Sequence, residues 1–252
     1  MSYEISIEPV YGFMLILARV GAIIMLMPGI GESWIPARAR LLLALAVSGV
    51  LYAGKSSGLQ FDTSDFGAYA SAVIAETATG LIFGGAMRLF LAAPVIAGQI
   101  TSQLTSISNI FVPAGMSLEA NSVLGVWFYM GALMFIFVSG LHYFMLDAIS
   151  SSYAVIAVGE LPHLGDAAKH IITVFAGVFI LGVQMAAPFV LLSLVFNLGV
   201  GLTNKMLATL PLYFVAMPMS ILGGLYVLAF AVAPMLNAFR GVFAAWLAAP
   251  FQ

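Results

Sequence analysis

Six long apolar blocks occupy most of this sequence, and they restrict the chain to folds that bury helices in protein or lipid. The blocks span residues 10–27, 38–53, 66 to about 93, 123–146, about 167–202 and about 210–249. A helix that crosses a bilayer needs about 20 apolar residues. Only 7% of the residues are charged, whereas soluble domains carry about 25%. The sequence therefore predicts an all-α membrane protein.

Turn-forming segments separate the blocks and proline interrupts some of them. The first block ends in PGIGESWIP, and the second is followed by the polar run GKSSGLQFDTSD. Pro94 is expected to kink the third block, and Pro218 and Pro234 lie inside the sixth. The last two blocks are longer than one span, which predicts tilt, kinks or segments outside the bilayer.

Composition and motifs exclude several functional classes. The net charge of −2 gives no footprint for nucleic acid, and the absence of cysteine excludes disulfides and thiolate chemistry. His142, His163 and His170 form no zinc-protease motif, and no nucleotide-binding or nucleophile-elbow motif occurs. We therefore expect no enzyme, no cofactor and no metal site. Glu4 and Glu8 argue against a secretory signal, so the first block is expected to be a retained helix.

A polar helix and an irregular stretch lie between the third and fourth blocks. In PVIAGQITSQLTSISNIF, residues 94–111, apolar residues recur at helical spacing while Gln99, Gln103 and Ser106 share another face. That face suits either a helix–helix contact or a water-filled conduit. SNIFVPAGMSLEANS, residues 108–122, is too irregular to lie in lipid, so it is a surface loop or it faces a cavity.

Charged and small residues inside the apolar blocks predict helix contacts. Arg19 and Glu76 are expected to pair, because charges in such segments normally face a partner or a cavity. A structural role is favoured over a proton relay, since no further acids lie in the last two blocks. Gly80 and Gly84 have the G-x-x-x-G spacing that permits close helix packing.

Three stretches together resemble the flagellar biosynthesis protein R family and its injectisome homologues in the type III secretion export gate. These stretches are ARVGAIIMLMPGIGESWIPARARLLLALAVS, then ETATGLIFGGAMRLFLAAPVIAGQITSQLTSISNIFVPAGMS with the following helix, and AAPFVLLSLVFNLGVGLTNKM with MPMSILGGL. The match covers about residues 15–225, and its specificity comes from the order and spacing of loose motifs. One departure is KMLATLPL, which stands where family members commonly have Arg-x-x-Pro-Gln-Met-Asn.

The resemblance implies a non-enzymatic subunit of the export gate in the bacterial inner membrane, within the flagellar basal body. Residues 1–165 would be similar to a P-type subunit, and residues 166–252 would form a Q-type helical hairpin. The implied partners are about five P-type and about four Q-type subunits, the B-type specificity switch, the A-type export subunit and unfolded protein substrates. The assembly would sit largely above the bilayer plane.

The same resemblance makes the irregular loop at 110–121 a plug that closes the pore. Its apolar residues are Ile110, Phe111, Val112, Pro113, Gly115 and Met116. The conduit would be lined or braced by Gln99, Gln103, Ser106 and Asn109.

Two other functions remain as alternatives. Gly- and Pro-broken helices with Glu76 are also found in secondary transporters, although such transporters have internal repeats and none is visible in this sequence. Ser139 and His142 could form an intramembrane hydrolase site, but a packed polar pair on one helix is the simpler interpretation.

Overall fold

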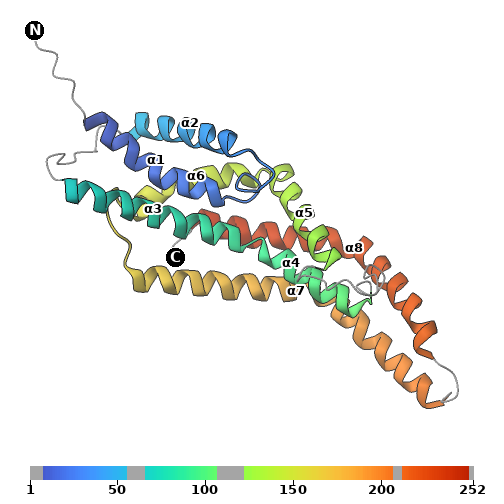
Figure 1. The fold of residues 1–252 in the computed structure, drawn as a ribbon. Helices are drawn as coiled ribbons and strands as arrows, with labels where there is room; N and C mark the ends of the chain where they lie inside the picture. Colours follow the sequence, from blue (N-terminus) through green and yellow to red (C-terminus); the bar gives the residue numbers. More distant parts are fainter. Residues whose placement is uncertain (1–7, 56–65, 107–121, 207–211, 250–252) are drawn as a thin grey trace, which may run out of the picture. The chain divides into compact units, whose positions relative to one another are not determined.

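The computed structural model describes residues 8–55, 66–106, 122–206 and 212–249, and every regular element in them is an α-helix (Figure 1). The all-α prediction is confirmed. The helices are α1 (Glu8–Leu26), α2 (Ala37–Lys55), α3 (Phe66–Leu89), α4 (Ala92–Leu104), α5 (Val123–Val138), α6 (Leu141–Val155), α7 (Leu164–Met206) and α8 (Leu212–Ala248). Five stretches of the described chain are long and apolar enough to cross a membrane, or six if α5 and α6 count as one broken span.

One compact unit contains α1, α2, α3 and α6, with the ends of α7 and α8, from residues 1–90, 140–175 and 246–252. In this unit α1 packs against both α2 and α3. Leu15, Ile16, Ile23 and Ile24 of α1 are fully buried. They recur at the spacing of one helix face, so the apolar periodicity of the first block explains why this face forms the core.

The second compact unit contains α4, α5 and the middle of the α7–α8 pair, from residues 91–139 and 176–245. A glycine crossing joins α4 to α5: a Cβ added at Gly98 would lie 2.5 Å from the Cα of Gly125. A second close approach joins α7 to α4, because a Cβ at Gly182 would lie 2.9 Å from the Cβ of Ile96. Small residues therefore allow the backbones of these helices to come into near contact.

The third and fourth apolar blocks do not form continuous helices. The third breaks at Phe90–Leu91, three residues before Pro94, which lies in the first turn of α4. Proline is tolerated there because the first N–H groups of a helix have no helical acceptor. The fourth breaks at Ser139–Gly140, where Gly140 has a φ of 76°. Glycine adopts this left-handed conformation without a steric penalty.

The last two blocks form α7 and α8, of 43 and 37 residues. At 1.5 Å per residue α7 is about 64 Å long, about twice the hydrocarbon thickness of a bilayer. Pro188 lies inside α7, and Pro218 and Pro234 lie inside α8. The two compact units interleave along the sequence, so they describe packing and do not test the predicted division at residue 165.

Candidate functional site

Arg19 and Glu76 form a two-pronged ion pair in the core of the first compact unit. Arg19 Nε donates to Glu76 Oε2 at 2.7 Å, and Arg19 Nη2 donates to Glu76 Oε1 at 2.9 Å. Both residues are 0% exposed. The structure thus brings together α1 and α3 through the two charges that the sequence suggested as partners. Paired geometry of this kind gives strong, directional hydrogen bonds.

The ion pair also holds the turn that follows α6. Arg19 donates to the main-chain carbonyls of Ile156, at 2.9 Å, and Ala157, at 3.2 Å. From the other side, the N–H of Gly159 donates to Glu76 Oε1 at 2.7 Å. One arginine and one glutamate therefore tie three parts of the chain together, and we call this arrangement the clamp.

Two further contacts complete the clamp on the side of α6. Arg19 Nη1 donates to the carbonyl of Ser152 at 3.3 Å, and the guanidinium carbon lies 4.2 Å from the ring centroid of Tyr153. The Tyr153 hydroxyl donates to the carbonyl of Ile16 at 3.4 Å. A buried cation is stable only when its donors are satisfied. Because each guanidinium nitrogen has an acceptor, the geometry favours a structural role for the pair.

Gly80 and Gly84 lie where α3 touches α1. A Cβ at Gly80 would lie 2.5 Å from the carbonyl oxygen of Arg19, and one at Gly84 would lie 3.0 Å from the Cα of Ile23. On the same helix, a Cβ at Gly85 would meet nothing within 4 Å. The glycine face brings α3 close enough for Glu76, one turn before Gly80, to reach Arg19.

The residues of the predicted polar face do not all have the same surroundings. The Cγ of Gln99 lies beside Gly125 of α5, 3.8 Å from where its Cβ would be. Gln103 and Ser106 line a cavity at the end of α4. Asn109 and the predicted plug residues Ile110, Phe111, Val112, Pro113, Gly115 and Met116 lie outside the described residues.

The cavity at the end of α4, here called the polar cavity, has a volume of about 270 Å³. Ser106 follows α4 with a φ of 58°, a left-handed conformation that is uncommon outside glycine and that ends the helix. Three further polar side chains reach the polar cavity from α7 and α8, and the sequence did not suggest them. These are Ser193, Asn197 and Ser220.

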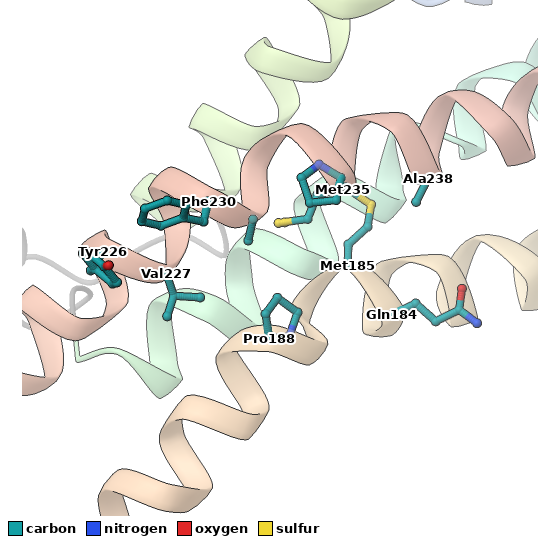
Figure 2. Close-up of a pocket in the computed structure, with 10 residues that line it drawn as sticks. Gln184, Met185, Pro188, Tyr226, Val227, Phe230, Met235 and Ala238 are labelled. Carbon is teal, nitrogen blue, oxygen red and sulfur yellow. The ribbon is translucent and has the colours of Figure 1, made fainter.

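A second cavity of about 590 Å³, the apolar groove, lies between α7 and α8 (Figure 2). Pro188 of α7 and Pro234 of α8 both line it, together with Met185, Phe230 and Met235. A proline inside a helix removes one hydrogen bond and bends the axis. Both walls of the apolar groove thus carry a proline, which explains why the two helices leave space between them here.

One further ion pair lies at the surface of the first unit, and sequence reasoning missed it. Arg88 Nη2 lies 3.8 Å from Oε2 of Glu32, in the turn after α1. Glu76 is twelve residues from Arg88, so helix geometry excluded that partner, but the carboxylate of Glu32 became visible only with the turn in place. Among the described residues, no group of His, Asp or Glu is arranged to hold a metal ion.

Comparison with known proteins places this geometry in one family. Residues 10–246 match the family described as "Bacterial export proteins, family 1". The chain is 36% identical over 224 residues to the flagellar biosynthetic protein FliR of Caulobacter vibrioides, covering 88% of this chain and 89% of that protein. It is 27% identical to the protein of the same name from Bacillus subtilis, covering 92% and 90%. It is 24% identical to the Escherichia coli protein, covering 88% and 84%.

Proposed function

The chain belongs to family 1 of the bacterial export proteins, and we propose that it is a subunit of the flagellar type III export gate. The observation that carries this proposal is its similarity to flagellar biosynthetic proteins over nearly the full length of both chains. In this role the chain is not an enzyme. It sits in the bacterial inner membrane, within the basal body of the flagellum.

Within the gate, residues 1–165 take the place of a P-type subunit and residues 166–252 form a Q-type hairpin. The partners are several P-type and Q-type subunits, the B-type specificity switch and the A-type export subunit. Large apolar side chains that stay exposed on α2, α7 and α8 support such an assembly, for example Leu42 at 66%, Leu191 at 64% and Phe230 at 68%. Contiguous apolar surface of this kind is covered by lipid or by protein.

The gate conducts unfolded proteins, and residues 110–121 close it as a plug. This part of the proposal draws on the sequence, where Pro113 and Gly115 break an apolar tip between α4 and α5. It also draws on the polar cavity, because Gln103 and Ser106 line that cavity four to seven residues before the first plug residue. In the first unit, the clamp keeps α1, α3 and the turn after α6 together while the gate works.

Removal of the gene from its host tests the proposal. We expect the deletion strain to lose swimming and the secretion of hook and filament proteins, and a plasmid copy to restore both. The flagellar export substrates should accumulate inside the cell. Normal secretion in the deletion strain would reject the proposed function, and saturable uptake of a small solute by liposomes containing the chain would support a transporter instead.

A further inference from the structure

The polar cavity is built from uncharged groups that both donate and accept hydrogen bonds. Three helices supply them: Gln103 and Ser106 at the end of α4, Ser193 and Asn197 from α7, and Ser220 from α8. Ser193 is only 7% exposed, and its hydroxyl accepts a hydrogen bond from Asn197 Nδ2 at 3.0 Å. At about 30 Å³ per water molecule, a volume of about 270 Å³ has space for several waters or a short piece of extended peptide.

The lining excludes several classes of ligand. None of the side chains that line the polar cavity is ionisable. Phosphates and carboxylates are held most strongly by charged donors, and Ca²⁺ and Mg²⁺ require carboxylate ligands. A ring of carboxamides and hydroxyls instead matches a neutral group that offers an N–H and a C=O side by side. The peptide main chain is such a group.

We propose that the polar cavity binds the main-chain amides of an extended polypeptide during export. This inference rests on the proposed function and adds to it a contact site. Each carboxamide or hydroxyl can serve an N–H or a C=O, whichever arrives. Recognition is therefore independent of the side chains of the substrate, which is what a gate for proteins of differing sequence requires.

The apolar groove on the same helix pair provides an internal comparison. Phe230, Met185 and Met235 line it, and it offers apolar contact with few hydrogen-bonding groups. An extended main chain placed there would leave amides unpaired, each at a cost of about 1–3 kcal/mol in mutational data. The polar cavity therefore binds the main chain, and the apolar groove does not.

Photocrosslinking in cells tests this contact directly. A photoreactive amino acid replaces Asn197, which is exposed, in a gate that holds a stalled export substrate. A second strain carries the same amino acid in place of Phe230. We expect crosslinks to the substrate from position 197 and not from 230, with two substrates of unrelated sequence. Crosslinks from 197 to another subunit alone, or no crosslink, would overturn the proposal.

A matched pair of variants separates hydrogen bonding from packing. Ser220→Thr keeps the hydroxyl, whereas Ser220→Val has the same shape without it. Loss of one hydrogen bond predicts a fall in export rate of about fivefold for Ser220→Val, equal for both substrates, with Ser220→Thr close to the wild type. The amount of purified complex should be the same in both strains. Equal export by the two variants would contradict the inference.

These results are distinguishable from a failure of the proposed function. If secretion survives deletion of the whole chain, the function itself is wrong. If deletion abolishes secretion while Ser220→Val exports normally and position 197 gives no substrate crosslink, the chain remains a gate subunit and only the role of the polar cavity is refuted.

Discussion

Alanine substitutions in the clamp should show strong energetic coupling between Arg19 and Glu76. Removing one partner of a buried ion pair leaves the other charge uncompensated, which destabilises proteins by about 3–5 kcal/mol. Arg19→Ala should fall at the upper end, because Glu76 then keeps only the N–H of Gly159 as a donor. Glu76→Ala should fall at the lower end, because Arg19 keeps three main-chain carbonyls as acceptors.

The double substitution should be milder than the sum of the single ones. It removes both charges and leaves main-chain groups of the turn, chiefly the Ile156 carbonyl and the Gly159 N–H, without their side-chain partners. Each such buried group costs about 1–3 kcal/mol. The single losses add to about 6–10 kcal/mol, and the double loss should be smaller by about 3 kcal/mol, within the range of measured couplings between contacting residues.

Thermal unfolding of the detergent-purified chain measures these losses. A chain of this size loses about 2–4 °C of Tm per kcal/mol, so each single variant should unfold about 6–20 °C below the wild type. The recovery of the assembled complex provides a second readout, which should fall in the same order. Additive losses in the double variant would refute the energetic coupling, even though the two side chains are in contact.

Three further outcomes follow from the same structure. Gly80→Ala should lower the Tm and the yield of complex, because its Cβ would lie 2.5 Å from the carbonyl oxygen of Arg19; Gly85→Ala, with open space around it, should be neutral or stabilising by about 0.5–1 kcal/mol. Gly140→Ala has space for its Cβ but a φ of 76°, so thermal unfolding should show a loss of about 1–2 kcal/mol from backbone strain alone. Deletion of residues 110–121 should leave the complex assembled but leaky to ions; an unchanged membrane conductance would count against the plug.

The helices were predictable from the sequence because the apolar blocks are long and their breaks carry glycine or proline. The break at Gly140 was not, since the residues on either side of it are apolar and a single glycine inside an apolar block is compatible with a continuous helix. The glycine crossing of Gly98 with Gly125 was missed for a similar reason: the two residues lie on different helices and share no local motif.

The Arg19–Glu76 pair could be anticipated because two isolated charges in apolar blocks need partners. The rest of the clamp could not, because Ile156, Ala157 and Gly159 contribute main-chain groups, which leave no trace in a pattern of side chains. The polar cavity was half visible for the same physical reason. The polar face of α4 pointed to Gln103 and Ser106, but the groups opposite them come from helices about 90 or more residues later in the chain.

Native mass spectrometry of this chain, expressed together with the P-type and Q-type proteins of its own genome, tests the central claim most directly. The account predicts a particle that contains one copy of this chain with several copies of each partner. A chain that is recovered only as a monomer or a homodimer, while the P-type and Q-type proteins assemble without it, would contradict the assignment to the export gate.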